Sequence, residues 1–280
     1  MTRPARILVL GSSGRLGRML RRHWCEVGLH PIWQFREASH DMLPLDEFLI
    51  FDPLSGPPVS APVDLVIGLA GIVPGKGELS LNIDLGLAAV NCAIALNARH
   101  VMLSSSAAVY GASTKPFSEE DTIYPLSPYG MAKLEMEDRA LGLAQRHGLQ
   151  ATMLRIGNVA GADALLDQRG TCRNLDQFAS GQGPVRSYIG PQGLSAVLTS
   201  LMRCACSGIS LPERLNVALR GGVGMADLCR AAGLEVTWQP APETALETVV
   251  MDVARLADLI SVADANAEAI IADWRADKNM

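Results

Sequence analysis

Short apolar runs that alternate with helical patterns are the feature of this sequence that most constrains its fold. The apolar runs, which are the candidate strands, lie at residues 5–10, 31–35, 48–52, 64–70, 101–105 and 151–156. Helical patterns separate several of them, at residues 15–27, 79–98 and 127–147. A strand that is apolar along its whole length is buried on both faces, and helices between such strands provide the cover. The sequence therefore predicts an α/β fold with a doubly wound parallel sheet.

The rest of the chain follows a looser pattern. With 280 residues, 49% of them hydrophobic, the chain can bury a sizeable core, in one large domain or in a domain with a smaller companion. Residues 162–193 are rich in Gly, Asp and Gln and predict a loop with little regular structure. Beyond it the patterns predict helices near 194–207, 224–232, 252–260 and 264–276, and strands at 214–218 and 247–251. We therefore expect a large domain over residues 1–161 and a smaller mixed α/β lobe over residues 162–280.

Charge and hydropathy exclude several classes of function. The net charge of −5 includes no basic block, so we expect no nucleic-acid partner. No segment approaches the ~18 uninterrupted apolar residues of a membrane span, and the N-terminus lacks the cleavage site of a secretory signal. We therefore expect a cytoplasmic protein without membrane contact. The six cysteines form no C-x-x-C pair and the five histidines show no ligand spacing, which predicts reduced thiols and no metal site.

A glycine-rich turn lies directly between the first predicted strand and the first predicted helix. In such a unit the first glycine allows a tight turn, the second lets the backbone approach a pyrophosphate, and the third allows helix and strand to pack closely. The helix N-terminus adds free N–H groups and a favourable dipole. The alternative is an ordinary glycine-rich turn. We expect a dinucleotide to be bound by this turn, through Gly11, Ser13, Gly14, Arg15, Leu16 and Gly17.

The residues after the second predicted strand bear on the choice between NADP and NAD. An acid there would bind the ribose hydroxyls of NAD, whereas an arginine favours the 2′-phosphate of NADP. Arg36 directly follows Phe35 at this place, which favours NADP. If the strand is longer, Glu37 would favour NAD instead. Asp52, at the end of the third strand, is a candidate for the adenine pocket or a plain turn residue.

Residues 127–137 place a tyrosine four residues ahead of a lysine at the start of a predicted helix. Ser127 is a good N-cap and Pro128 suits the first helical position, so Tyr129 and Lys133 lie on one face of the helix. The ammonium group and the positive nicotinamide of an oxidised cofactor would lower the pKa of the phenol by ~3 units from about 10. Tyr129 would then move the proton of a carbinol oxygen during hydride transfer. The alternative is a surface tyrosine beside a solvated lysine.

Three consecutive serines, residues 104–106, end the strand predicted at 101–105. Ligands of open α/β sheets lie beyond the carboxyl ends of the strands, where the glycine turn and Tyr129 are also expected. The serines therefore predict hydroxyl groups in the same crevice, unless they simply terminate the strand.

The order of these motifs over residues 5–161 resembles that of the extended short-chain dehydrogenase/reductases, the NAD-dependent epimerase/dehydratase family. The resemblance rests on Gly11-x-x-Gly14-x-x-Gly17, Leu69-Ala70-Gly71, residues 104–111 (SSSAAVYG), Tyr129-x-x-x-Lys133 and residues 155–161 (RIGNVAG). It implies a Rossmann-type domain with further cofactor contacts from Leu69, Ala70, Gly71, Tyr129 and Lys133. It also implies that Ser106 hydrogen-bonds the substrate oxygen and that Lys133 holds the nicotinamide ribose.

The same resemblance suggests residues that touch the substrate. Asn82 and Asn158 match asparagines of the family that lie near the nicotinamide and the substrate, although either could be a loop-capping amide. Arg186 resembles the arginine of the family's R-D-F-I-H-V segment. The acids that follow that arginine are missing here, where residues 190–193 read GPQG. This departure weakens a direct transfer of nucleotide-sugar specificity.

The residues after the serines bear on the reaction. Dehydratases of the family carry an Asp-Glu pair where this chain has Ala107 and Ala108, and alanine cannot move protons. We therefore expect an NAD(P)-dependent oxidoreductase or epimerase that acts on a carbinol or carbonyl carbon of a small molecule, such as a sugar or nucleotide sugar. The alternative is an NADP-binding redox sensor without catalysis. Family members often form homodimers through the helix that carries Tyr129, so a homodimer is possible here.

Overall fold

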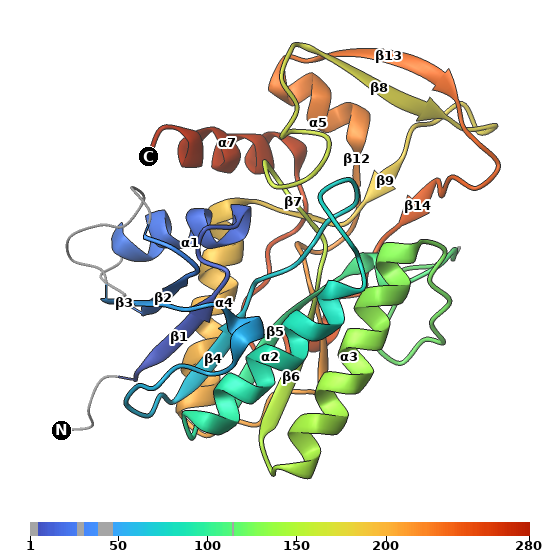
Figure 1. Cartoon of the computed structure of the whole chain (residues 1–280). Coiled ribbons are helices and arrows are strands. Elements are labelled where there is room, and N and C mark those ends of the chain that lie inside the picture. Colours follow the sequence, from blue (N-terminus) through green and yellow to red (C-terminus); the bar gives the residue numbers. More distant parts are fainter. Residues whose placement is uncertain (1–4, 27–30, 39–46, 114) are drawn as a thin grey trace.

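The computed structural model of the chain describes residues 5–26, 31–38, 47–113 and 115–280. Its centre is a parallel sheet of seven strands in the order β11-β6-β5-β4-β1-β2-β3 (Figure 1). The strands are β1 (Ile7–Leu10), β2 (Ile32–Phe35), β3 (Glu47–Ile50), β4 (Leu65–Gly68), β5 (His100–Ser106), β6 (Gln150–Ile156) and β11 (Arg214–Val217). The predicted fold class, a doubly wound parallel sheet, is confirmed.

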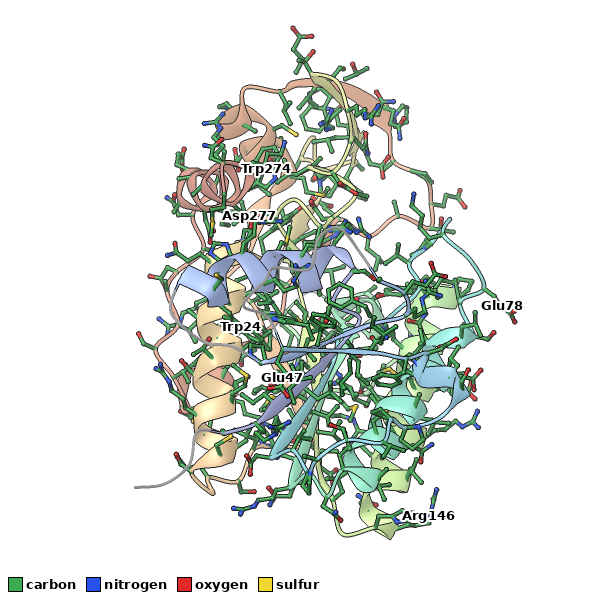
Figure 2. All side chains as sticks on the ribbon, turned by 60° about the vertical axis from the view of Figure 1, so that its left-hand side comes forward. Trp24, Glu47, Glu78, Arg146, Trp274 and Asp277 are labelled. Atoms are coloured by element: carbon green, nitrogen blue, oxygen red, sulfur yellow. The ribbon has the colours of Figure 1, made fainter. Side chains whose placement is uncertain are left out.

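Helices cover both faces of this sheet. They are α1 (Arg15–Glu26) and α4 (Pro191–Cys206) on one face, and α2 (Leu81–Ala95) and α3 (Pro128–Arg146) on the other. Val9 and Ile67 belong to the core beneath α1 and α4, whereas their neighbours Leu8 and Val66 belong to the core beneath α2 and α3. Trp24 of α1 is fully buried in the first core (Figure 2). Because both sides of each strand face a core, the strands appear in the sequence as continuous apolar runs.

A smaller group of elements lies at the carboxyl ends of the strands (Figure 1). It contains β7 (Asn158–Val159), β8 (Cys172–Gln177), β9 (Val185–Arg186), β10 (Tyr188–Ile189), β12 (Val223–Gly224), α5 (Met225–Ala232), β13 (Glu235–Pro240), β14 (Thr248–Val249) and α7 (Ala267–Lys278). The short helix α6 (Ala254–Ala257) packs beside β11 instead. Short 3-10 helices, η1 (Pro53–Ser55) and η2 (Ala107–Val109), follow β3 and β5.

The prediction that residues 162–193 form a loop with little regular structure is wrong. The segment contains β8, β9 and β10, and its last residues begin α4. β8 pairs in parallel with β13, and the register joins Leu175 to Trp238. The partner strand β13 is mostly exposed, so its sequence lacks the apolar run that marks a buried strand. It also lies about sixty residues further along the chain, so the residues near β8 give no sign of the pairing.

The predicted division of the chain at residue 161 stays a prediction. Two elements beyond residue 161 nevertheless belong with the large sheet: the strand β11 is part of it, and the helix α4 covers one of its faces. β11 pairs in parallel with β6, with Leu215 opposite Leu154, and α4 packs beside α1. The chain thus returns from the carboxyl ends of the strands to complete the sheet before it enters α5.

A buried carboxylate of the C-terminal helix α7 forms an ion pair with α1. Asp277 is 3% exposed and accepts hydrogen bonds from Arg22, at 3.1 Å from Nε and 2.5 Å from Nη2. The ring of His23 lies 3.3 Å from the same carboxylate. Figure 2 shows Asp277 and Trp274 at the end of the molecule opposite to Arg146, which marks the C-terminal end of α3. α7 therefore lies toward the carboxyl ends of the strands, with the smaller group of elements.

Candidate functional site

The glycine turn between β1 and α1 has a shape that requires glycine. Gly11 has φ +83°, and a Cβ atom there would lie 2.6 Å from the backbone nitrogen of Ala70. A Cβ atom at Gly17 would lie 2.6 Å from the carbonyl oxygen of Gly11, which also accepts the N–H of Gly14 at 3.0 Å. The turn thus touches residues 69–71 and leads into the first turn of α1, whose N–H groups suit a phosphate. These features fit a dinucleotide pyrophosphate.

Gln34 of β2 anchors this turn, and sequence analysis missed it. Its side chain is buried, and its Oε1 accepts the N–H of Gly11 at 2.9 Å. Its Nε2 donates to the carbonyl oxygen of Phe51 at 2.7 Å. The amide therefore ties the glycine turn to the chain after β3. The sequence signal that could have identified Gln34 is its place as a polar residue inside the apolar run PIWQF.

The start of α3 is placed against the end of β5. The hydroxyl of Ser127 accepts the N–H of Gly130 at 3.0 Å, and Pro128 occupies the first helical position, as predicted. A Cβ atom at Gly130 would lie 2.0 Å from the carbonyl oxygen of Ala108, so only glycine permits this approach. As a result Tyr129 lies beside the end of the serine strand.

Tyr129 and Lys133 both contact the serine run. Ser106 lies near the phenol of Tyr129 and lowers its pKa, and Ser106 Oγ accepts the N–H of Ala108 at 3.1 Å. Lys133 Nζ donates to the carbonyl oxygen of Ser104 at 2.9 Å. Tyr129 is half-buried and Lys133 is 3% exposed. The structure therefore brings the three predicted catalytic side chains to one place, the carboxyl end of β5.

The charges around the phenol differ from those that the sequence predicts. Burial raises the pKa of Tyr129, and Ser106 and the positive charge of Arg15 act against it. The expected lowering of this pKa by Lys133 together with a bound oxidised nicotinamide stays a prediction. The ammonium group is directed to the carbonyl oxygen of Ser104, and burial outweighs the favourable charges. Burial likewise lowers the pKa of Lys133 to about 8, while Glu137 raises it.

Arg15 extends from the glycine turn to the segment after β7. Its Nη1 lies 3.0 Å from Asp167 Oδ2, in the segment after β7, and its charge reaches Tyr129. Its neighbour Ser13 is exposed, and Leu16 packs against the core beneath α1 and α4. Of the residues predicted to bind the cofactor through this turn, Arg15 is thus the one whose side chain faces the phenol.

The residues predicted to discriminate between cofactors follow β2 and β3. β2 ends at Phe35, as predicted, so Arg36 is the first residue after the strand and is exposed together with Glu37. Asp52 Oδ1 accepts the N–H of Leu54 at 3.0 Å and caps η1. Of the two predicted alternatives for Asp52, the adenine pocket and a plain turn residue, this hydrogen bond fits the turn residue.

Asn82 lies with two other predicted residues on the far side of the glycine turn. Its side chain binds backbone groups only, the N–H and carbonyl of Ile72 and the carbonyl of Leu79, at 2.9–3.1 Å. A Cβ atom at Gly71 would lie 3.0 Å from Asn82 Oδ1 and 3.3 Å from Lys133 Nζ. Gly71, Asn82 and Lys133 therefore form one cluster. The amide closes the loop before α2, and a contact with substrate stays a prediction.

The other two predicted substrate residues also have protein partners. Arg186 donates from Nη1 and Nη2 to the carbonyl oxygens of Val185, Leu246 and Glu247 at 2.6–2.9 Å. Asn158 lies opposite Tyr188 in the pairing of β7 with β10, and its side chain acts to lower the pKa of that tyrosine. These contacts hold β7, β9 and β10 at the carboxyl ends of the strands. Their substrate roles stay predictions.

Metal and membrane features are absent from the parts of the chain that the structure describes. There, no three His, Cys, Asp or Glu side chains gather as a metal ion would require, and no helix has the length and apolar character to cross a bilayer. All six cysteines are free.

Comparison with known proteins identifies the family. A model of the NAD dependent epimerase/dehydratase family matches residues 7–188, which is more than half of the chain. The chain belongs to this family. The resemblance inferred from the sequence motifs is confirmed, and the chain is an enzyme of this family.

Characterised relatives match parts of this family member. It is 29% identical over 177 residues to a dTDP-6-deoxy-L-talose 4-dehydrogenase (NAD(P)(+)) of Kitasatospora kifunensis, which covers 58% of this chain and 54% of that protein. It is 45% identical over 64 residues to a UDP-glucose 4-epimerase of Azospirillum brasilense, which covers 22% and 18% respectively. The matches therefore span about half or less of the relatives' length.

Solved structures share the whole fold at low identity. A UDP-glucose 4-epimerase from Stenotrophomonas maltophila, with bound NAD and formylated UDP-arabinopyranose, has a TM-score of 0.80 at 17% identity and 99% coverage of both chains. A UDP-glucose 4-epimerase from Brucella ovis in complex with NAD has a TM-score of 0.80 at 18% identity, covering 96% of this chain and 97% of that one. At this identity the likeness shows the fold alone.

Proposed function

We propose that this family member is an NAD(P)-dependent oxidoreductase or epimerase that acts at a carbinol or carbonyl carbon of a sugar or nucleotide sugar. The main support for this proposal is that Ser106, Tyr129 and Lys133 lie close together at the carboxyl end of β5. The glycine turn, with its charged residue Arg15 near the phenol, lies at the same end of the sheet.

Each of the predicted site residues has a separate role in the proposed reaction. A bound nicotinamide dinucleotide would supply the acceptor and donor of hydride. Tyr129 moves the proton on the substrate oxygen, Ser106 hydrogen-bonds that oxygen, and Lys133 holds the nicotinamide ribose. The N–H groups at the start of α1 bind the pyrophosphate. Ala107 and Ala108 offer no proton carrier, which supports redox chemistry or epimerisation over dehydration.

The relatives support the substrate class. The Kitasatospora protein is a dehydrogenase of a dTDP-sugar, and the two structural neighbours are UDP-glucose epimerases. A redox sensor that binds NADP without catalysis is the second function considered, but the intact Ser106, Tyr129 and Lys133 favour an enzyme. A homodimer and a cytoplasmic location stay predictions.

The test is turnover on a defined panel. We expect the purified chain, given NAD⁺ or NADP⁺, to oxidise or epimerise at least one member of a panel of UDP- and dTDP-hexoses. Absorbance at 340 nm reports oxidation and proton NMR of the sugar reports epimerisation. A mass spectrum of co-purified cofactor separates the two, because an epimerase retains its dinucleotide. Dinucleotide binding without turnover of any member of the panel would contradict the proposal and favour the sensor.

Arg36 gives a prediction on cofactor choice. We propose that NADP is preferred, because the exposed guanidinium directly after β2 can bind a 2′-phosphate. Arg36→Ala should weaken NADPH binding by about tenfold, or ~1.4 kcal/mol, and leave NADH binding unchanged. Energy transfer from tryptophan to the reduced nicotinamide measures both affinities. Arg99→Ala, an exposed arginine just before β5, is the matched control. Equal affinities in the unmodified chain would exclude the NADP preference.

A further inference from the structure

Three residues one turn apart on α3 hold three consecutive residues of β5. On α3 they are Tyr129, Lys133 and Glu137, and they contact Ser106, Ser104 and Ser105 respectively. Positions i, i+4 and i+8 share one face of a helix, so these contacts fix how α3 lies along β5. Two of the three α3 residues are those assigned to the chemistry. Glu137 has no assigned role in the proposed reaction.

The Glu137 carboxylate is fully buried and has partners from three strands. Its Oε1 accepts the hydroxyl of Ser105 at 2.5 Å. Arg155 of β6 donates to it from Nε at 3.1–3.2 Å and from Nη2 at 2.7 Å, and is itself fully buried. Arg214 of β11 donates from Nε at 3.3 Å. A buried carboxylate with this many partners is held in one orientation.

The same carboxylate supplies negative charge next to Lys133. The lysine is 3% exposed, so its ammonium form is costly to bury. Its hydrogen-bond acceptor, the carbonyl of Ser104, is neutral, and Glu137 is the group whose charge favours protonation. A neutral lysine at this position would no longer stabilise a phenolate at Tyr129.

We propose that Glu137 is a positioning residue of the site, which fixes the serine strand against α3 through Ser105 and keeps Lys133 an ammonium ion. The proposal rests on the proposed function, in which Lys133 serves the phenol and the cofactor. The charged and titratable groups that face Glu137 are Lys133 on its own helix, Arg155 on β6 and Arg214 on β11, with Tyr110 beyond Arg155.

The direct test measures the protonation of Lys133. The chain contains only four lysines, Lys76, Lys115, Lys133 and Lys278, so protein labelled with ¹³C-lysine gives few signals, and Lys133→Met assigns the one of interest. We expect this signal to titrate with a pKa of about 8. Glu137→Gln, which keeps the shape but not the charge, should lower the midpoint by about one unit or more. Glu135→Gln, an exposed carboxylate on the same helix, should leave it unchanged.

Turnover gives the second readout. On a substrate from the panel, the alkaline limb of the kcat profile of Glu137→Gln should move to lower pH by the same amount, so that kcat at pH 8 falls about fivefold or more. If Arg155, left without its carboxylate, prevents folding, the double variant Glu137→Gln with Arg155→Met removes the unpaired buried charge and should show the same shift.

Each outcome bears on one claim. A folded Glu137→Gln protein with an unmoved Lys133 signal overturns the proposal, as does an equal shift in Glu135→Gln. Loss of folding in both Glu137 variants also counts against it, because the carboxylate would then serve the core and not the site. An unmodified chain without turnover contradicts the proposed function and leaves the titration result standing.

Discussion

Tyr129→Phe is expected to lower kcat by about 10²–10⁴-fold, the range for loss of a positioned acid–base group. Phenylalanine retains the aromatic ring but removes the hydroxyl whose pKa Ser106 and Arg15 lower. The glycine turn and β2 do not depend on this hydroxyl, so dinucleotide affinity should stay within about twofold, or ~0.4 kcal/mol. Steady-state kinetics on the substrate found in the panel and a fluorescence titration with NADPH measure the two quantities.

The chain offers a matched control for this substitution. Tyr124 is 71% exposed in the segment before α3, and Tyr124→Phe should leave both kcat and affinity unchanged. Retained turnover in Tyr129→Phe would remove the phenol from the mechanism. Equal loss of turnover in Tyr124→Phe would show that the effect is not specific to the site.

The sheet and the start of the site were predictable because their signals are local. The apolar runs mark buried strands, and Ser127 and Pro128 mark the start of α3 by their capping chemistry. The spacing of Tyr129 and Lys133 then follows from helix geometry. Such signals need only neighbouring residues, so β1, β5 and α3 appear where the sequence places them.

What the sequence did not predict depends on contacts between distant residues. β8 is a strand because β13 pairs with it, and Gln34 anchors the glycine turn because β2 pairs with β1. The burial that raises the pKa of Tyr129 and the charge of Arg15 that opposes it depend likewise on residues that only the assembled fold brings together. Spacing along one helix predicts the reacting groups but not the electrostatics around them.

Gly17→Ala tests the glycine turn and should have the second largest effect. A Cβ atom there would lie 2.6 Å from three backbone atoms, the carbonyl oxygen of Gly11 and the Cα and carbonyl oxygen of Ser12. Backbone cannot move aside as a flexible side chain can, so α1 must shift away from the turn. We expect the free energy of unfolding to fall by about 1–3 kcal/mol. The Kd for NADPH should rise about 10–100-fold, because the N–H groups of α1 leave their places.

Gly142→Ala separates this effect from the general cost of altering a helical glycine. Gly142 lies within α3, and a Cβ atom there would come no closer than 3.6 Å to a neighbour, the flexible end of Arg146. Alanine should therefore stabilise the chain by about 0.5–1 kcal/mol, because glycine loses more backbone freedom on folding, and NADPH affinity should not change. Chemical unfolding and the fluorescence titration measure both variants. If Gly17→Ala bound NADPH as tightly as Gly142→Ala, close packing of α1 on the turn would not be what forms the dinucleotide site.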